Sequence, residues 1–509
     1  MIERLTSRRA WLATPQAIWV SLAVVTVAAA LLRFVGLSGP HTLLFDETYY
    51  VKDAWSLIHL GYEGTWGDDP NPAFEAGDGS GYSDTGSFVA HPPLGKWLIG
   101  LGLALFGNNP FGWRVMTAVV GTALVPLIFA IAKKITASGW LGILAALFLA
   151  IDPLAISMSR VALLDTHLAL FILLGAWFAL LDRDGTVRRI REGAESNRLA
   201  GPVVWRRPWL IAAGLALGFA SGVKWSGLYA LAILGLAVVA ADYVDRRRAG
   251  ITRPLEAAIS RQGPASFVLL VFPAILTYLV SWAGWLVTSG GYDRGSASNP
   301  FVALWNYHRS VLKFHEGVTS THTYASPALE WIPMLNPTLM SRDSTDDGSV
   351  GLMAALPNPL LWWVGVAAVA YLVVRVALAY ARRKRIHGSD LIPMIGVLGT
   401  YAPWLLLPDR TMFTFYAITI LPFVILAVVI AAKRLAEPAD PVLLPDATRT
   451  EIRHERDRVE AAAGTRRIAV RTVLGAAIAC GLFFLPFGTG WMEPEALYKA
   501  HLWLPSWFL

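Results

Sequence analysis

Long apolar blocks are the feature of this sequence that most limits what the chain can fold into. Blocks of roughly 20 residues rich in Leu, Ala, Val and Ile recur along the chain, and this length suits a helix that crosses about 30 Å of hydrocarbon. Only helices and closed barrels satisfy their backbone hydrogen bonds there, and these blocks do not alternate polar with apolar residues. The chain is 55% hydrophobic and 16% charged, whereas soluble domains have about 25% charged residues. The sequence therefore predicts an all-α polytopic membrane protein.

The basic segments between these blocks set the predicted topology, because cytoplasmic loops carry the excess of Lys and Arg. They are residues 133–134, 183–207, 245–261, 382–385 and 433–467. With all of them in the cytoplasm, we expect about eleven transmembrane helices, an internal N-terminus and an external C-terminus. The expected helices run over about 18–36, 114–133, 139–157, 161–182, 209–222, 224–242, 265–289, 358–380, 389–407, 412–432 and 468–487.

For two apolar segments, length and flanking charge do not directly show whether they span the membrane. The apolar block Leu94 to Phe106 has only about 13 residues, so we expect a re-entrant or interfacial helix. At the N-terminus, Arg4, Arg8 and Arg9 precede an apolar run as in a signal peptide, but no small-residue cleavage site follows. We therefore expect a retained first helix.

The predicted organisation is a transmembrane catalytic core over 1–436, a cytoplasmic loop over 437–467, and a last helix with an extracytoplasmic tail over 468–509. Within the core, two long extracytoplasmic loops cover about 37–113 and 290–357. The first loop starts with apolar residues at helical spacing, which predicts a helix lying in the membrane interface. Its Gly-, Asp- and Pro-rich stretch from Gly61 to Phe88 predicts irregular structure.

Several classes of function are disfavoured. The net charge is +7, but most arginines sit beside apolar blocks, so no nucleic-acid partner is expected. There is no Walker loop and no Gly-x-Gly-x-x-Gly, which disfavours a nucleotide donor in a usual phosphate cradle. Histidine spacing gives no metal signature, and we infer no cofactor, although a divalent metal near Asp46 and Glu47 stays open. The single cysteine, Cys480, excludes an internal disulfide.

The predicted topology collects charged and imidazole side chains on the extracytoplasmic face. They are Asp46, Glu47, His91, Lys96, Arg114, Arg160, Asp165, His167, Lys224, His308, His315, His322 and Arg410. Polar groups at membrane depth are costly and usually line a cavity. Cations can hold a phosphate, and a carboxylate can accept the proton of an attacking hydroxyl. The pattern favours a reaction on a phosphorylated substrate carried in the membrane.

Several of these residues also have a structural alternative. Asp46 and Glu47 can serve as a helix cap with first-turn acid, and Lys96 can extend to the interface. His91 can belong to a stiff turn before a helix. Arg160 with Asp165 can form a structural ion pair, and Lys224 with Trp225 can form an interfacial anchor.

Seven motifs, in order along the chain, resemble those of the protein O-mannosyltransferase family. The motifs are Leu44 to Tyr50, His91 to Lys96, Gly112 to Arg114, Ser159 to Asp165, Gly218 to Leu228, Ser320 to Ser326 with Trp331, and Arg410 to Tyr416. The first also resembles the Asp-Glu motif of GT-C glycosyltransferases. The resemblance implies a GT-C fold with eleven helices and transfer of mannose, with inversion, from polyprenyl-phosphate mannose to Ser or Thr of a secreted protein. It implies a multi-pass protein of the cell membrane whose partners are this donor, the protein acceptor and the bilayer.

The same resemblance implies roles for individual residues. Asp46 would be the general base, and Glu47 would position acceptor or donor. The implied roles of the others are lipid-phosphate binding for Arg114, Lys224 and Arg410; loop shaping or phosphate binding for His91 and Lys96; contact with acceptor or donor for His322 and Tyr324; and a place in the substrate site for Arg160, Asp165 and Trp225.

One departure and two alternatives remain. Eukaryotic members carry a β-trefoil domain in the second long loop, and that loop is too short for it here, which favours the bacterial form; richness in Ala, Arg, Val and Trp suggests an actinobacterial member. A GT-C transferase that adds a lipid-linked sugar to a lipid or cell-wall glycan would share the same site. A transporter or flippase of a lipid-linked anion is the other alternative, but the internal repeats typical of transporters are absent. Docking on the secretion channel stays open.

Overall fold

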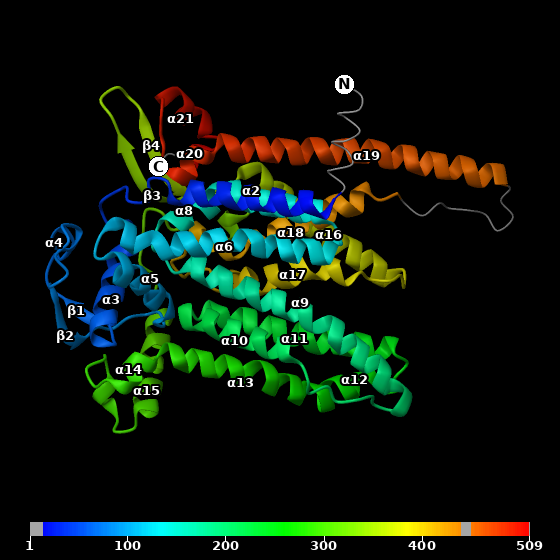
Figure 1. The fold of residues 1–509 in the computed structure, drawn as a ribbon, viewed down its shortest axis with the longest axis horizontal. Coiled ribbons are helices and arrows are strands. Elements are labelled where there is room, and N and C mark those ends of the chain that lie inside the picture. The colour runs from blue at the N-terminus through cyan, green and yellow to red at the C-terminus, as the bar shows by residue number, and fades with distance from the viewer. Residues whose placement is uncertain (1–13, 439–448, 508–509) are drawn as a thin grey trace.

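The structure is a computed structural model that describes residues 14–438 and 449–507. Most of these residues form one bundle of helices that run side by side (Figure 1). The N-terminal arginines Arg4, Arg8 and Arg9, and residues 439–448 of the predicted cytoplasmic loop, lie outside the described residues. The bundle helices are α2 (Pro15–Phe34), α6 (Pro110–Thr136), α7 (Gly139–Ile151), α8 (Pro153–Arg160), α9 (Asp165–Ser196), α10 (Pro208–Val223), α11 (Ser226–Arg248), α13 (Gly263–Ser281), α16 (Pro359–Ala381), α17 (Gly388–Thr400), α18 (Leu421–Ala436) and α19 (Arg449–Phe483).

The prediction of a multi-pass membrane protein is confirmed. Among the described residues, six helices are long and apolar enough to cross a membrane, or up to seven if the bent pair α7–α8 is one span. That pair bends by 56° at Asp152-Pro153, where Pro153 removes a backbone donor and the Asp152 carboxylate accepts from the Ala155 amide of α8. All eleven predicted segments contain helix, but several are short, and the number of crossings stays a prediction.

Local sequence signals explain where the helices begin and how closely they pack. Asn109, Ser138 and Asn358 each precede a helix, and each side chain accepts the amide hydrogen of the residue three positions later. Small residues bring α10 against α13, because a Cβ at Gly214 or Gly218 would lie 2.2 Å from a backbone carbonyl oxygen of α13.

The two long loops gather at one end of the bundle, which we call the loop end (Figure 1). The first loop holds α3 (Glu47–Leu60), β1 (Gly64–Trp66), α4 (Asn71–Glu75), β2 (Tyr82–Gly86) and α5 (Leu94–Phe106). The second follows α14 (Ala283–Val287) and holds η2 (Arg294–Ser296), α15 (Pro300–Glu316), η3 (Ala328–Trp331), β3 (Thr338–Ser344) and β4 (Val350–Ala355). The remaining elements are α12 (Pro254–Glu256), η1 (Ala257–Gln262), η4 (Ala402–Leu406), η5 (Thr414–Thr419), α20 (Leu485–Thr489), β5 (Met492–Glu493), α21 (Glu495–His501) and η6 (Pro505–Trp507).

The loops are more ordered than their composition predicts. The stretch 61–88, predicted as irregular, contains the antiparallel pair β1–β2 and the short helix α4, so that prediction is wrong. In the second loop, β3 pairs with β4, and β4 pairs with β5 from the C-terminal segment. These two small sheets add to the predicted all-α class without changing the helical bundle.

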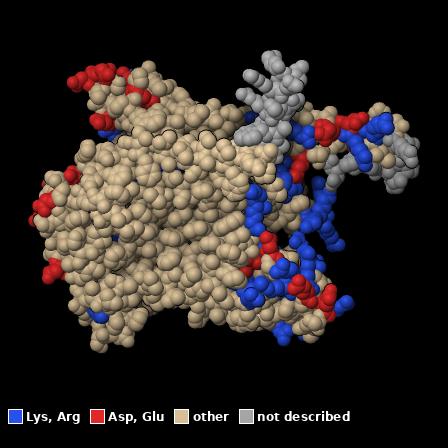
Figure 2. All heavy atoms as spheres, in the orientation of Figure 1, with Lys and Arg blue, Asp and Glu red and all other residues tan. Residues whose placement is uncertain are grey.

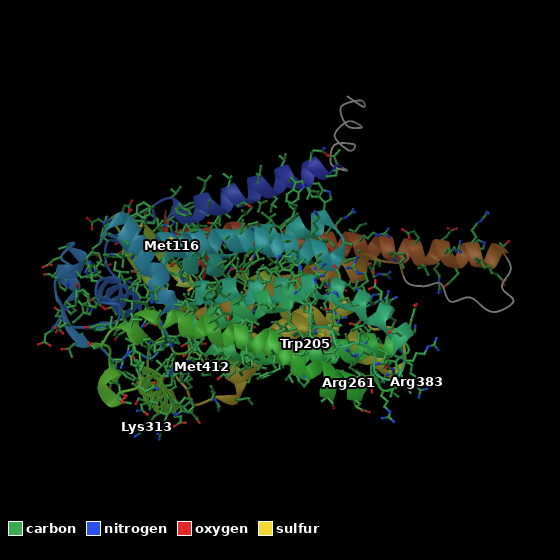
Figure 3. All side chains as sticks on the ribbon, turned by 60° about the horizontal axis from the view of Figure 1, so that its bottom comes forward. Met116, Trp205, Arg261, Lys313, Arg383 and Met412 are labelled. Atoms are coloured by element: carbon green, nitrogen blue, oxygen red, sulfur yellow. The ribbon has the colours of Figure 1, made fainter. Side chains whose placement is uncertain are left out.

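Charge is distributed unevenly along the bundle. Figure 2 shows Lys and Arg gathered at the end opposite the loop end, which we call the basic end, and an almost uncharged surface between the two ends. Figure 3 likewise places Arg261 and Arg383 at the basic end, and Lys313 at the loop end with Met412 toward it. An uncharged belt between two polar ends is what a bilayer requires of a protein that spans it.

Candidate functional site

Glu47, the first residue of α3, is held in place by four hydrogen bonds inside the protein. Its carboxylate is fully buried and accepts two parallel hydrogen bonds of 2.8 Å from the Arg114 guanidinium of α6. It also accepts from the backbone amides of Leu44 at 2.8 Å and Ala162 at 2.7 Å. Four donors occupy the lone-pair positions of a carboxylate, so Glu47 holds α3 against α6 and the α8–α9 turn.

Arg114 also binds the chain segment that precedes Asp46. Besides Glu47, it donates to the carbonyl oxygens of Pro40 at 2.7 Å and Thr42 at 2.8 Å, and its side chain is fully buried. These partners position the segment that leads into Asp46. They favour a positioning role for Arg114 over the phosphate-binding role expected from the sequence.

Asp46, the residue before Glu47, has far fewer hydrogen-bond partners. Its side chain makes no helix-capping hydrogen bond, and its one hydrogen-bond partner among the described residues is the Tyr50 hydroxyl, which donates to Oδ2 at 3.3 Å. Asp46 thus occupies the N-cap position of α3 without capping it through its side chain, and Glu47 is the acidic residue of the first turn. Burial raises the pKa of the Asp46 carboxyl, while the positive charge of Lys224 opposes that rise. The preceding residue, Phe45, has a φ of 50°, a strained value for a bulky side chain that fixes the turn presenting Asp46.

Lys224 and Asp165 form a buried ion pair beside Asp46. The Lys224 ammonium donates to Asp165 Oδ2 at 2.7 Å and lies 4.9 Å from the centre of the Tyr416 ring. The charges of both Lys224 and Asp165 act on Asp46. The sequence motifs around 165 and 224 thus meet at the carboxylate of the first loop.

Arg160 is not part of this cluster. Its guanidinium donates to the carbonyl oxygens of Leu32 and Arg33 at 3.1 Å, of Val35 at 2.8 Å and of Gly36 at 3.0 Å. These are the last carbonyls of α2 and its exit turn, groups that a helix leaves without internal partners. The structural ion pair that the sequence allowed between Arg160 and Asp165 is therefore wrong, and Arg160 anchors the end of the first helix.

Lys96 is also held by carboxylates rather than left open. It is buried in α5 and forms ion pairs with Glu63 and with Asp53, the second at 3.8 Å. Burial raises the pKa of Asp53 to about 7, with Lys96 opposing the rise. The three groups join the end of α3 to α5, which favours a structural role for Lys96 in shaping the loop.

A second polar group sits where the two long loops meet. The Arg410 guanidinium donates to the carbonyl oxygen of His315 at 2.8 Å and contacts its Nδ1 at 3.1 Å. The His315 ring lies 5.7 Å from the His91 ring and 5.7 Å from the Trp225 ring. Burial lowers the pKa of His91 well below its usual value, and the charges of Lys224, Lys96 and Arg410 lower it further. Burial and the neighbouring cations therefore both disfavour the protonated form of His91.

Aromatic side chains form the wall next to Phe45. The exposed His322 ring lies 5.5 Å from Phe45 and 5.1 Å from Phe413, and its Nδ1 accepts from the Tyr324 amide at 3.1 Å. His322 also acts electrostatically on Asp46. The later loop motif thus reaches the same site.

The structure divides the sequence-predicted residues into two groups. Those that it brings together are Asp46, His91, Asp165, Lys224, Trp225, His322, Tyr324 and Arg410, and those held in the frame are Glu47, Lys96, Arg114 and Arg160. Sequence reasoning missed Tyr50 as a partner of Asp46, although a spacing of four residues puts both on one helix face. Among the described residues, no group of three or more His, Cys, Asp or Glu side chains could hold a metal ion.

The chain is similar to known proteins of one family. A family model described as dolichyl-phosphate-mannose-protein mannosyltransferase matches residues 77–287, and one described as the C-terminal four TMM region of protein-O-mannosyltransferase matches residues 300–507. A polyprenol-phosphate-mannose–protein mannosyltransferase of Corynebacterium glutamicum is 29% identical over 95% of this chain and 92% of its own. The one of Mycobacterium tuberculosis is 27% identical over 96% and 92%.

Solved structures show the same fold. A chain of the S. cerevisiae protein O-mannosyltransferase Pmt1-Pmt2 complex bound to the sugar donor has a TM-score of 0.71 at 14% identity, covering 98% of this chain and 93% of that chain. The Archaeoglobus fulgidus oligosaccharyltransferase has a TM-score of 0.52 at 14% identity, covering 96% and 58%. The fold and the comparisons define a membrane glycosyltransferase of the GT-C class. Within that class, the chain belongs to the protein O-mannosyltransferase family, as its motifs indicated.

Proposed function

We propose that this protein transfers mannose from a polyprenyl-phosphate carrier to a Ser or Thr hydroxyl of a protein acceptor, at the loop end of the bundle. One observation carries the proposal. Among the described residues, Asp46 and Arg410 are opposite charges without a direct ion-pair partner, and both act on the Tyr416 hydroxyl, so they belong to one cluster. Buried or half-buried charges without partners are costly, which is the usual mark of groups kept for a ligand.

Asp46 is suited to the role of general base. As the acceptor oxygen attacks the anomeric carbon, its proton passes to the Asp46 carboxylate, the new oxygen–carbon bond forms, and the bond from that carbon to the phosphate oxygen breaks. Attack from the face opposite the phosphate inverts the anomeric configuration. One carboxylate is enough, because the leaving phosphate needs charge stabilisation rather than a proton. The raised pKa of Asp46 brings its basicity closer to the pH at which it works.

Lys224 and Arg410 are our candidates for stabilising the leaving phosphate. Among the residues that the structure describes, Arg410 pairs with no carboxylate, and Lys224 pairs with one, Asp165. Cations fixed in a site shielded from water stabilise developing negative charge without having to reorganise. Glu47 and Arg114 keep the Asp46 turn in place through the hydrogen bonds described above.

An apolar cavity next to this site suits the carrier's hydrocarbon chain. It has a volume of about 400 Å³ and is lined by Ser221, Leu228, Ile275, Tyr278, Trp305 and His308, together with Trp225. Trp225 donates to the Tyr278 hydroxyl at 3.1 Å and stacks on His308. Because Trp225 directly follows Lys224, a chain lying in the cavity would bring its phosphate end to the cations.

The orientation in the membrane follows from charge. We propose that the basic end lies in the cytoplasm and the loop end outside the plasma membrane, because cytoplasmic loops carry the excess of Lys and Arg. An external site would meet acceptor proteins while they are still unfolded, which favours action near the secretion channel. The one cysteine, Cys480, is buried, so single cysteines placed at Asp78 and at Glu195 can report the side of each end through a membrane-impermeant thiol reagent.

The test is transfer of labelled mannose by the purified protein. Wild type, Asp46→Asn and the control Asp78→Asn would be given polyprenyl-phosphate mannose and a Thr- and Pro-rich peptide. Asp78 is an exposed carboxylate of the same loop, away from the cluster. We expect transfer by wild type and Asp78→Asn and its loss in Asp46→Asn. A wild type that labels a lipid or a cell-wall glycan but no peptide would instead favour the other GT-C transferase reaction.

A further inference from the structure

His315 joins three segments that are far apart in the sequence. It is near the end of α15, in the second long loop, and its Nε2 contacts the carbonyl oxygen of Ala90 in the first loop at 3.0 Å. On its other side, Nδ1 lies 3.1 Å from Nη2 of Arg410, in the turn before η5. The His315 backbone carbonyl also accepts from Arg410 Nη1 at 2.8 Å. One residue therefore holds the guanidinium by both its backbone and its side chain.

These partners fix the protonation of the His315 ring. A guanidinium only donates hydrogen bonds, so Nδ1 has to accept. A carbonyl oxygen only accepts, so Nε2 has to carry the hydrogen and donate to Ala90. The ring is thus the neutral tautomer with its hydrogen on Nε2. Burial and the charge of Arg410 lower the pKa of His315 to about 4, which keeps the ring neutral at ordinary pH.

The Arg410 guanidinium has five N–H groups and uses two of them on His315. Within the part of the chain that the structure describes, its Nε is buried and has no hydrogen-bond partner. Its two terminal nitrogens are held by His315, as described above, so the direction of the Nε–H is fixed by His315. The charges of Arg410 and Lys224 both act on His91 and on His315, which places the two cations around the same space. A fixed, unpartnered guanidinium donor next to a second cation is a site for an anion.

We propose that His315 is a positioning residue that, as the neutral Nε2–H tautomer, holds Arg410 in the orientation in which the guanidinium meets the phosphate of the lipid donor. This inference rests on the proposed function and names a determinant of its donor site. His315 itself does not touch the phosphate. It acts by accepting from Arg410 at Nδ1 and by tying that contact to the Ala90 turn, directly before the His91 motif.

The proposal is tested by a double-mutant cycle on binding of the carrier. The variants are His315→Phe, Arg410→Met and the combination, and the readout is the affinity for polyprenyl phosphate, measured on the whole protein by fluorescence. We expect each single variant to weaken binding about tenfold, the loss expected for one charge-assisted hydrogen bond. The combination should bind no more weakly than Arg410→Met alone, because His315 has nothing left to hold. Additive losses would overturn the proposal.

Further variants separate a positioning role from a general loss of structure. Gln offers both an acceptor and a donor, so His315→Gln should recover most of the affinity that His315→Phe loses. His59→Phe changes an exposed imidazole at the end of α3 and should leave binding unchanged. Failure of the Gln variant to bind better than the Phe variant, with equal melting temperatures, would overturn the role.

Mannose transfer keeps this proposal distinguishable from the proposed function. The KM for polyprenyl-phosphate mannose should be about tenfold higher in His315→Phe than in wild type, while the KM for the peptide should be the same in both. A wild type that transfers mannose while the variant keeps its donor KM overturns the His315 inference alone. A wild type that transfers nothing to peptide, but shows the non-additive loss of carrier binding, overturns the protein acceptor alone.

Discussion

Both ends of the helix bundle bury charged side chains, and they satisfy them differently. At the basic end, Arg207 donates to Asp182 at 2.6 Å, to Asp242 at 3.1 Å and to Ser266 at 2.9 Å, and all four side chains are buried. At the loop end, Asp46 accepts one hydrogen bond, from Tyr50 at 3.3 Å. A charge surrounded by opposite charges holds helices together, whereas a charge kept without one is available to a ligand. The loop end also contains paired buried charges, such as Glu47 with Arg114, so the difference lies in Asp46, which has no ion-pair partner among the described residues. This separates the charges that stabilise the fold from the one available for chemistry.

The largest expected effect is on the rate at the loop end. Asp46→Asn should lower mannose transfer by about 10²- to 10⁴-fold, the contribution typical of a general base. It should leave the melting temperature unchanged or raise it, because the amide removes a buried charge that has no ion-pair partner. Transfer rate and thermal unfolding of the same preparation test both expectations. A variant that is inactive only because it melts much earlier would contradict the separation.

The matching effect at the basic end is on stability. Arg207→Met leaves the buried carboxylates of Asp182 and Asp242 without their cation and should cost about 3–5 kcal/mol. The folded fraction should still transfer mannose with a normal KM, because the network lies at the far end of the bundle from Asp46. Unfolding followed by tryptophan fluorescence, together with kinetics below the unfolding transition, would check this. A change of donor KM in the folded protein would show that the ends are coupled.

A smaller effect, on the pH dependence of activity, is expected from Tyr50→Phe, which tests the protonation of Asp46. Burial raises the pKa of Asp46, and the charge of Lys224 and the hydrogen bond from Tyr50 pull it down. Without the hydroxyl, the pKa of Asp46 should rise further, so the base becomes protonated at higher pH. The acid limb of the kcat/KM profile should therefore move to higher pH, with several-fold lower activity on that limb and little change on its plateau. An unmoved acid limb would mean that Asp46 does not set it.

The smallest effect concerns Asp53, a carboxylate of the loop end that we assign to structure. Burial raises the pKa of Asp53 to about 7 despite the neighbouring Lys96. A raised pKa means that the folded protein holds the proton more tightly, so stability from this group is present at low pH and is lost as pH rises toward 7. Asp53→Asn should thus be more stable than wild type at pH 8 and nearly equal to it near pH 4. A stability gain that is the same at both pH values would contradict this.

The sequence predicted the membrane helices well because their signal is local. Apolar length and flanking charge identify a span without knowledge of its neighbours, and the ordered motifs around 46, 91, 165, 224 and 322 identified residues that the structure brings together. Which cation holds which partner could not be predicted. Arg114, Arg160 and Lys96 look like phosphate ligands in a list of outer-face cations, but their partners come from segments 67, 124 and 33 positions away.

Distance along the sequence also explains most of the other features of the structure that were not predicted. Pairing of β4 with β5 joins residue 350 to residue 493, a contact that no local pattern signals. The amphipathic helix α15 had a local signal in Asn299-Pro300, a cap followed by a proline at the first helical position, and was missed inside a loop judged by its length. His315 has chemical meaning only through Ala90 and Arg410, which lie 225 and 95 positions away.

The long sequence separation of these contacts also bears on how the enzyme is made. Translation runs from the N-terminus, so the turn that carries Asp46 leaves the ribosome hundreds of residues before Arg410 does. Until the late turn is inserted and meets His315, the nascent chain holds a base without its guanidinium. A partly synthesised or truncated chain would therefore sit in the membrane with most of its helices in place and yet be unable to turn over donor. The polar cluster around Asp46 is thus completed only after most of the chain has been made.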